Sequence, residues 1–209
     1  MNPRALLNQY LDQCPLIAII RGVTPGEAES IGQAIYEAGI RIIEVPLNSP
    51  EPLDSIRRLA QRFGEQMLVG AGTVFTPANV EDVLANGGRL IVSPHFNPAV
   101  VRAAVEAGMV ACPGYFTPTE AFAALDAGAT ALKLFPAEAA TPDVLKAQRA
   151  VIPADVPVMV VGGVKPDNMA GWLAAGASGF GLGGGLYKSG QSPEDTLDKA
   201  RAYVAGLGR

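Results

Sequence analysis

Short apolar runs alternate with longer segments of helical periodicity along the chain. The runs have the length of strands and are rich in Val, Ile and Leu, which is typical of parallel strands buried on both faces. Eight such runs are found: Leu16–Ile20, Ile40–Val45, Met67–Ala71, Leu90–Val92, Val110–Cys112, Ala131–Phe135, Val158–Val161 and Gly179–Leu182.

The helical segments between these runs carry start and stop signals. Several begin with a Ser or Thr that can cap the helix, followed by proline at the first helical position. Several end in a glycine that can take the left-handed conformation closing a helix. The predicted starts are Thr24-Pro25, Ser49-Pro50, Thr76-Pro77, Thr117-Pro118 and Thr141-Pro142, and the closing glycines are Gly39, Gly108, Gly128 and Gly176.

Eight strands, each followed by a helix, predict an α/β fold that is a single (β/α)8 TIM barrel. We expect one domain over residues 1–209, with a short amphipathic helix within residues 1–14. An open doubly wound sheet has the same alternation and is the competing fold. The even spacing of the units, without a long insertion, favours the closed barrel.

Composition narrows the class of protein. Hydrophobic residues make up 49% of the chain and charged residues 17%, so a large core can form. A net charge of −4 without a Lys/Arg run makes nucleic acid a poor partner. The N-terminus lacks the apolar region of a signal peptide, and no apolar stretch is long enough to span a membrane. We therefore expect a cytoplasmic protein in which Cys14 and Cys112 are reduced.

Metal chemistry has few ligands to work with in this sequence. One histidine and two cysteines are too few for a typical transition-metal site. A magnesium site built from carboxylates alone stays open at this point. His95, the single histidine, lies on a predicted loop and is interpreted as a positioning or surface residue.

Two charged residues are predicted to lie inside the barrel near the carboxyl ends of its strands, where such barrels carry their chemistry. Side chains alternate across a strand, so Leu132 and Leu134 face the helices and Lys133 faces the interior. The same argument turns Glu44 inward. Both residues lie on even-numbered strands, so they can share one layer across the barrel.

A buried lysine suits attack on a carbonyl group, because burial and a nearby cation such as Arg21 lower its pKa. Glu44 is expected to transfer protons. The alternative is a structural ion pair between Lys133 and Glu44. Buried ion pairs are weak sources of stability, so catalysis is the favoured interpretation.

Several motifs in order along the chain resemble the 2-keto-3-deoxy-phosphosugar-acid aldolases, a family of class I aldolases. This resemblance covers nearly the whole chain. It implies a homotrimer of (β/α)8 barrels that needs no metal or other cofactor. It also implies a phosphorylated keto-deoxy sugar acid as substrate, with pyruvate and glyceraldehyde 3-phosphate as products. The motifs are Ile42–Val45, Gly70–Val74, Ser93-Pro94, Cys112–Gly114, Leu132–Ala137 and Gly162-Gly163.

The resemblance implies a role for five residues. Lys133 matches the lysine that forms the Schiff base, and Glu44 matches the general acid/base, which acts through a bound water. Thr73 matches the residue that helps hold the carboxylate of the pyruvyl group, while Pro94 and Phe135 match its walls. A strand-end hydroxyl for Thr73, a simple turn for Pro94 and core packing for Phe135 are the alternatives.

One departure from the family pattern bears on the substrate. The branch that cleaves the phosphogluconate derivative tends to have an arginine, which binds the substrate carboxylate, where this chain has Asn48. Arg21 can supply that cation, or it can be a salt bridge at the rim. Ile20–Gly22, Pro46–Pro50 and Val161 look more like the 2-dehydro-3-deoxy-6-phosphogalactonate aldolases.

Val161 is expected near C4, the carbon at which the two substrates differ. The expected activity is therefore cleavage of 2-dehydro-3-deoxy-6-phosphogalactonate. The alternatives are the phosphogluconate epimer, an enzyme that accepts both epimers, and a non-catalytic barrel that binds a phosphorylated ligand.

Glycine runs after the seventh and eighth strands predict a phosphate site. Their amides can approach phosphate oxygens without obstruction, and these loops often bind phosphate in such barrels. Turn formation alone is the alternative. The family often has a serine in the second loop, at the position of Gly184 or Gly185, so one side-chain contact is missing. Lys165 and Lys188 can approach the phosphate, although solvent exposure is favoured for both. The runs are Gly162 and Gly163, and Gly183, Gly184 and Gly185.

Overall fold

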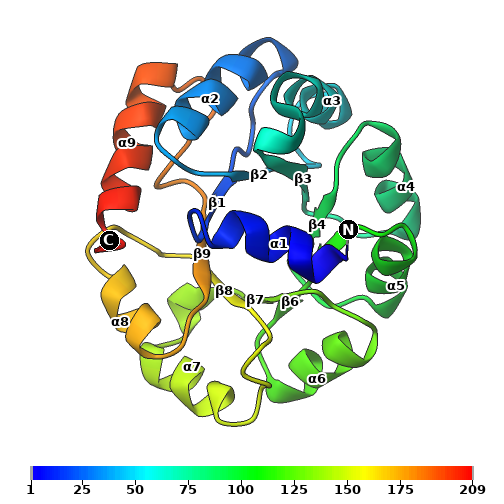
Figure 1. Ribbon diagram of the computed structural model, residues 1–209, viewed down its shortest axis with the longest axis vertical. Helices are drawn as coiled ribbons and strands as arrows, with labels where there is room; N and C mark the ends of the chain where they lie inside the picture. The colour runs from blue at the N-terminus through cyan, green and yellow to red at the C-terminus, as the bar shows by residue number, and fades with distance from the viewer. Residues whose placement is uncertain (1, 209) are drawn as a thin grey trace.

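The computed structural model describes residues 2–208 and shows an α/β barrel of parallel strands surrounded by helices (Figure 1). Met1 and Arg209, the ends of the predicted domain, lie outside the described residues. The strands are β1 (Leu16–Ile19), β2 (Ile42–Pro46), β3 (Leu68–Gly72), β4 (Leu90–Val92), β5 (Val110–Cys112), β6 (Gly114–Tyr115), β7 (Leu132–Leu134), β8 (Val158–Val161) and β9 (Gly179–Leu182).

The sheet nearly closes on itself at Pro113. Its strand order is β5-β4-β3-β2-β1-β9-β8-β7-β6, so its two edge strands are consecutive in the chain and only Pro113 separates them. Proline has no N–H to donate to a neighbouring strand, which explains the interruption. Across the seam, Thr130 N donates to Ala111 O at 2.8 Å and Lys133 N donates to Pro113 O at 2.9 Å.

The predicted alternation of strands and helices is confirmed, and each predicted apolar run overlaps an observed strand, although β2 and β3 each extend one residue beyond the run. The strand Gly114–Tyr115 is an addition to the prediction. The helices within residues 2–208 are α1 (Pro3–Leu11), α2 (Pro25–Glu37), α3 (Pro52–Phe63), α4 (Pro77–Ala85), α5 (Pro98–Glu106), α6 (Pro118–Asp126), α7 (Pro142–Arg149), α8 (Met169–Ala174) and α9 (Pro193–Ala205), with 3-10 turns η1 (Gly64–Gln66) and η2 (Ala137–Ala139). None of these helices is long and apolar enough to cross a membrane.

The predicted helix signals are correct with one exception. Threonines cap α2, α4, α6 and α7, and the four predicted closing glycines have positive φ. The predicted start at Ser49-Pro50 is wrong, because α3 begins at Pro52 after Glu51, which has a left-handed conformation with φ of 40°. The Ser49 hydroxyl accepts a hydrogen bond from Gly22 N at 2.9 Å, so it serves a neighbouring loop.

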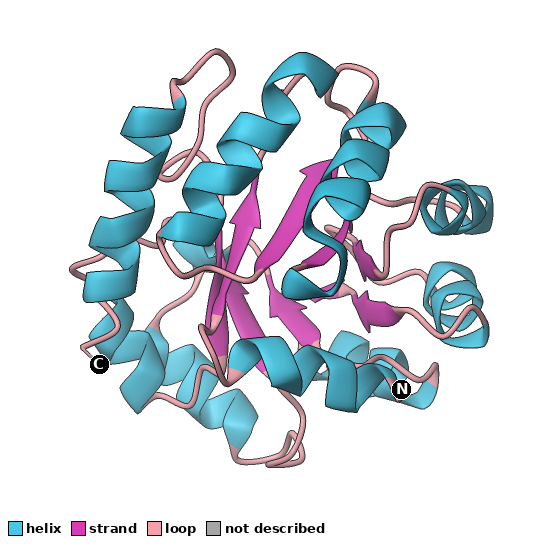
Figure 2. Ribbon diagram, turned by 45° about the horizontal axis from the view of Figure 1, so that its top comes forward, coloured by secondary structure: helices cyan, strands magenta, loops and turns pink. Residues whose placement is uncertain are grey.

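Two apolar layers build the molecule. The outer layer packs the helices against the sheet and includes Leu132 and Leu134, as the alternation along that strand predicts. The inner layer fills the barrel and includes Leu6, Leu7 and other buried residues of α1. These pack against the first inward-facing residues of the strands, so α1 closes the amino-terminal end of the barrel (Figures 1 and 2).

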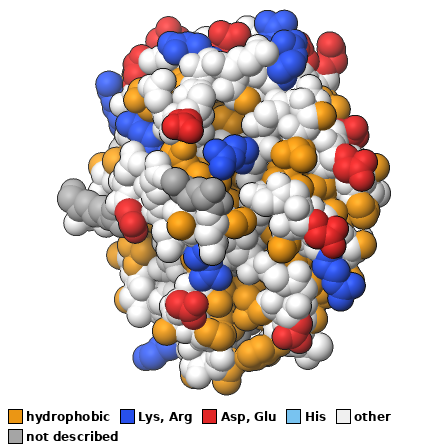
Figure 3. All heavy atoms as spheres, turned by 45° about the vertical axis from the view of Figure 1, so that its right-hand side comes forward, with side chains coloured by type: hydrophobic (Ala, Val, Ile, Leu, Met, Phe, Trp, Pro, Cys, Tyr) orange, Lys and Arg blue, Asp and Glu red, His pale blue; other side chains and the backbone are white. Residues whose placement is uncertain are grey.

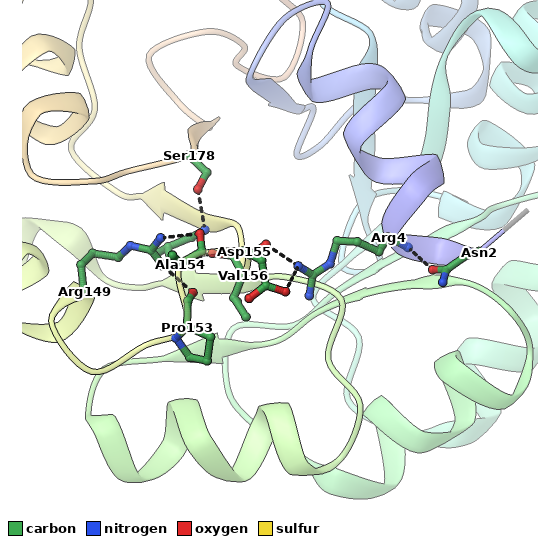
Figure 4. A network of polar contacts seen from close by, with 9 residues as sticks. Asn2, Arg4, Arg149, Pro153, Ala154, Asp155, Val156 and Ser178 are labelled. Carbon is green, nitrogen blue, oxygen red and sulfur yellow. Dashed lines mark hydrogen bonds and ion pairs between the residues drawn. The ribbon is translucent and has the colours of Figure 1, made fainter.

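A polar network fixes the loop that enters β8 at the same end of the barrel (Figure 4). The guanidinium of Arg149, at the end of α7, donates to Ala154 O at 3.1 Å and to Val156 O at 3.0 Å. Arg4 of α1 contacts Asp155 in an ion pair of 3.8 Å. The loop between α7 and β8 is thereby attached to both neighbouring helices.

Candidate active site

One cavity of about 650 Å³ lies at the carboxyl ends of the strands. All of the residues that the sequence predicts for the site line it. They are Arg21, Glu44, Thr73, Pro94, Lys133, Phe135, Val161, Gly162, Gly163, Gly183, Gly184 and Gly185. They come from seven of the strands and their following loops, so the barrel brings together residues far apart in the sequence.

Lys133 and Glu44 project into the barrel interior from opposite walls. Strands β1, β9 and β8 separate β2 from β7 in the sheet order, which places the two residues across the barrel. Lys133 is 6% exposed and Glu44 is 2% exposed. The Lys133 amine lies 4.8 Å from the ring centroid of Phe135, which forms part of the cavity wall.

Burial opposes the charge of both groups. Loss of solvation raises the pKa of Glu44 to about 7, although the positive charges of Lys133 and Arg21 act in the opposite direction. Loss of solvation also lowers the pKa of Lys133, against the influence of Glu44. The cation of Arg21 lowers it further. The site therefore makes the neutral amine easier to reach than for a lysine in water, and it keeps the proton on Glu44 up to about neutral pH.

Glu44 and Lys133 do not form an ion pair, and none of the ion pairs among residues 2–208 includes either one. The Oε2 atom of Glu44 is buried and has no hydrogen-bond partner in the described part of the chain. Buried polar atoms are normally satisfied, so this oxygen is available to a water or a ligand. A Cβ at Gly72 would lie 1.9 Å from the same oxygen, so only glycine leaves room for the carboxyl group.

Arg21 and Thr73 form a polar corner of the cavity. The Arg21 Nη2 atom donates to Thr73 Oγ1 at 3.4 Å, and Nη1 donates to Asn48 Oδ1. Within residues 2–208, Arg21 has no ion pair, so the alternative of a rim salt bridge is wrong. Thr73 has a φ of 59°, which is rare for a β-branched residue, and such strained residues cluster at functional sites.

Both glycine runs line the cavity. Gly162 and Gly163 have φ of 110° and 63°, so these positions favour glycine for conformational reasons as well as for space. Tyr203 of α9 donates from its hydroxyl to Val164 O at 2.9 Å, and a Cβ at Gly185 would meet that hydroxyl at 2.2 Å. This tyrosine therefore touches both glycine-rich loops.

Two cations lie beside the glycine loops. Lys165 and Lys188 are exposed, as the sequence favours, and both also line the cavity. His95 is exposed, and the centroid of its ring lies 5.6 Å from that of Phe75. This agrees with the interpretation of His95 as a surface residue. Within residues 2–208, no three His, Cys, Asp or Glu side chains gather closely enough to hold a metal ion.

A family model described as KDPG and KHG aldolase matches residues 7–201. The chain belongs to this aldolase family.

Similarity to individual members covers most of each chain. The 2-dehydro-3-deoxy-6-phosphogalactonate aldolase of Escherichia coli (strain K12) is 48% identical over 196 residues, which are 94% of this chain and 96% of that protein. A solved structure described as native KDPGal has a TM-score of 0.92 at 47% identity and covers 94% and 95% of the two chains. A cube-shaped, highly porous cage designed by fusing symmetric oligomeric domains contains a chain with a TM-score of 0.91 at 48% identity, covering 93% of this chain and 72% of that one.

The sequence did not point to all of the residues that line this aldolase cavity. Glu138, in η2, lies across the first glycine loop, because a Cβ at Gly162 would meet its Oε2 atom at 2.0 Å. Its place just beyond the family stretch Leu132–Ala137 is the one signal that could have found it. Tyr203 and Ser189 carry no such signal, because α9 and the loop before it lie outside the quoted motifs.

Replacing Glu44 by glutamine should stabilise the protein at high pH. The native carboxyl keeps its proton up to about pH 7, whereas the unfolded carboxyl loses it near 4.5. Between these values the native state binds more protons, so the stability of the wild type falls as the pH rises. Glu44→Gln should therefore raise the free energy of unfolding above pH 7 by up to about 3 kcal/mol, and by progressively less toward pH 4.5.

Urea denaturation at several pH values measures this difference. Glu81→Gln, on the exposed surface of α4, makes the same change of charge and should alter the stability by less than about 0.5 kcal/mol. A difference between Glu44→Gln and wild type that does not vary with pH would contradict the raised pKa.

Proposed function

We propose that the protein is a class I aldolase that cleaves 2-dehydro-3-deoxy-6-phosphogalactonate to pyruvate and D-glyceraldehyde 3-phosphate. The observation that carries this proposal is the buried Lys133 amine, whose pKa burial lowers, at the floor of a cavity that also contains the Glu44 carboxyl. A neutral amine is the nucleophile that Schiff-base formation requires.

The reaction follows from these two groups. The neutral Lys133 amine attacks the C2 carbonyl. Glu44 gives its proton to the departing hydroxyl, so water leaves, a protonated imine forms and Glu44 becomes a carboxylate. Glu44 accepts the proton of the C4 hydroxyl while the C3–C4 bond breaks and its electron pair moves into the imine. Glyceraldehyde 3-phosphate leaves, protonation of the enamine at C3 restores the imine, and hydrolysis releases pyruvate and the free amine.

Two groups of lining residues suit the two anionic groups of this substrate. Arg21 and Thr73 offer a cation and a hydroxyl for the carboxylate, and Pro94 and Phe135 supply apolar walls for the pyruvyl group. The glycine loops offer backbone amides for the phosphate. Lys165 and Lys188 add positive charge beside them, which compensates for the serine missing from the second loop.

We also infer that the barrel has eight strands rather than nine. β5 and β6 are best taken as one strand that Pro113 interrupts, which gives a (β/α)8 barrel with α1 as an additional helix. The shared core layers support a single aldolase domain over the whole chain.

Borohydride should trap pyruvate on Lys133. Incubation of the protein with pyruvate and borohydride reduces the imine to a stable secondary amine, and mass spectrometry of peptides locates it. We expect the adduct on the Lys133 peptide. Lys133→Ala should lose the adduct and all turnover, because the nucleophile is absent.

Lys146→Ala is the matched control, because Lys146 is exposed on α7, away from the cavity. It should keep both the adduct and the turnover. Absence of an adduct in wild type, or an adduct on another lysine, would contradict the mechanism. The alternative of a non-catalytic phospholigand-binding barrel predicts that wild type has no turnover. In that case the only effect of Lys133→Ala would be a loss of stability.

Val161 supports the galactonate form of the substrate. It is the last residue of β8, pairs in register with Gly181 and lines the cavity beside the first glycine loop. An apolar side chain there offers no hydrogen bond to the C4 hydroxyl of the phosphogluconate epimer. The alternative specificity for that epimer, or for both, depends on this contact.

Val161→Thr, which keeps the shape and adds a hydroxyl, should shift the preference toward the phosphogluconate epimer. One hydrogen bond is worth about 0.5–1.5 kcal/mol, so the ratio of kcat/KM values for the two epimers should change by about 2- to 10-fold. Steady-state assays of both epimers measure the ratio. Equal kcat/KM values for the two epimers in wild type would remove the galactonate preference.

We propose that the protein assembles as a homotrimer. Five of the seven large hydrophobic residues exposed among residues 2–208 fall between Phe75 and Phe122, on one side of the barrel around α4, α5 and α6. Figure 3 brings this side forward and shows apolar side chains gathered between charged ones. Monomers rarely expose large apolar patches. The five are Phe75, Leu84, Val105, Phe116 and Phe122.

Phe122→Glu should convert the trimer to monomers, because it places a charge in the proposed apolar interface. Phe122 is 42% exposed, so the monomer should remain folded. Size-exclusion chromatography with light scattering gives the mass. Val151→Glu, at an exposed residue after α7, is the control and should stay trimeric. A monomeric wild type, or a trimeric Phe122→Glu protein, would contradict this assembly.

A further inference from the structure

Asn48 lies outside the cavity wall but holds a residue that lines it. Its Oδ1 atom accepts a hydrogen bond from Nη1 of Arg21, while Nη2 of Arg21 donates to Thr73 Oγ1 at 3.4 Å. The guanidinium is therefore held between two acceptors that follow β2 and β3. Both acceptors are neutral groups.

The neighbouring serine fixes the backbone of the same loop. Gly22 N donates to Ser49 Oγ at 2.9 Å, and Ser189 Oγ donates to Gly22 O at 3.1 Å. The segment Asn48-Ser49 thus holds both the side chain of Arg21 and the peptide that follows it. This contact is also the reason that Ser49 does not begin α3.

The positive charge of Arg21 has no partner within this arrangement. Arginine stays protonated in proteins, and Arg21 takes part in no ion pair among residues 2–208. Its charge acts on Glu44 and on Lys133, which lie deeper in the cavity. A cation that is oriented but not neutralised is suited to binding an anionic ligand.

We propose that Asn48 is a positioning residue, whose neutral amide oxygen orients the Arg21 guanidinium toward the carboxylate of the keto acid and leaves its charge available. The inference rests on the proposed function and adds a residue that does not itself touch the substrate. Neutrality is the essential property, because a carboxylate at this position would orient the arginine equally well but would pair with its charge.

Asn48→Asp separates these two properties, because aspartate has almost the same shape as asparagine. We expect KM for the phosphosugar acid to rise at least about tenfold, since a hydrogen bond to a charged group is worth that factor or more. The concentration of pyruvate that gives half-maximal borohydride trapping should rise in parallel. The value of kcat should change by a smaller factor than KM, because the carboxylate contact is made in both the ground and the transition state.

Two further variants test the role of Arg21. Asn48→Ala should raise KM by less than Asn48→Asp does, because it removes the orientation but adds no opposing charge. In an Arg21→Ala background, Asn48→Asp should have no additional effect on KM, because it acts through the arginine. Asn8→Asp, an exposed site on α1 at the other end of the barrel, is the control for the added charge and should leave KM unchanged.

Two results would overturn the inference. The first is a KM for Asn48→Asp equal to that of wild type. The second is a double variant, Asn48→Asp with Arg21→Ala, whose KM rises by the product of the two single effects. A purely structural role would lower the thermal stability of Asn48→Asp and would persist without Arg21, which also overturns it. Trapping of pyruvate on wild-type Lys133 tests the proposed function separately. If pyruvate is trapped on wild type but Asn48→Asp keeps the wild-type KM, only the role of Asn48 is wrong. If pyruvate is not trapped on wild type, both proposals are wrong.

Discussion

Lys133 and Glu44 are both buried at one end of the barrel, away from water. Burial disfavours the charged form of each group, so it lowers the pKa of the lysine and raises the pKa of the glutamate. A direct ion pair would restore both charges, yet their charged atoms stay beyond ion-pair distance. The barrel holds the two groups on opposite walls, and Gly72 leaves space for the carboxyl group. The desolvation opposes folding and must be offset by the apolar layers around it.

Arg21 adds a third charge to this end of the barrel without removing the first two. It lies at the exposed rim, where it acts on both buried groups, and its hydrogen bonds go to neutral acceptors. A lone cation lowers the pKa of the lysine and attracts an anion at the same time. A carboxylate bound to Arg21 would screen this cation and so weaken its effect on the pKa of Lys133.

The sequence predicted those features that follow from local rules. Alternation along the strand placed Lys133 inside and Leu132 outside, and threonine before proline located most helix starts. Ser49-Pro50 carries the same signal, but a long-range contact with Gly22 takes its hydroxyl, and no local pattern records such a contact. The break at Pro113 was missed for a similar reason, since it depends on the pairing of strands across the seam.

The site residues that the sequence predicted are those within short motifs, and the lining residues that it missed lie outside them. The residues with a predicted role belong to short stretches at strand ends, and the cavity includes all of them. Glu138 and Tyr203 reach the glycine loops from η2 and α9, and their positions depend on how those elements pack. Packing between elements far apart in the chain cannot be read from periodicity, which describes one element at a time.

Helix α1 has a consequence for the interior of the barrel. Its four buried side chains join the inner apolar layer at the amino-terminal end, on the opposite side from the substrate cavity. A helix that touches none of the reacting groups thereby helps to set the dielectric environment of the lysine, and damage to that layer would alter the chemistry from the far side of the molecule.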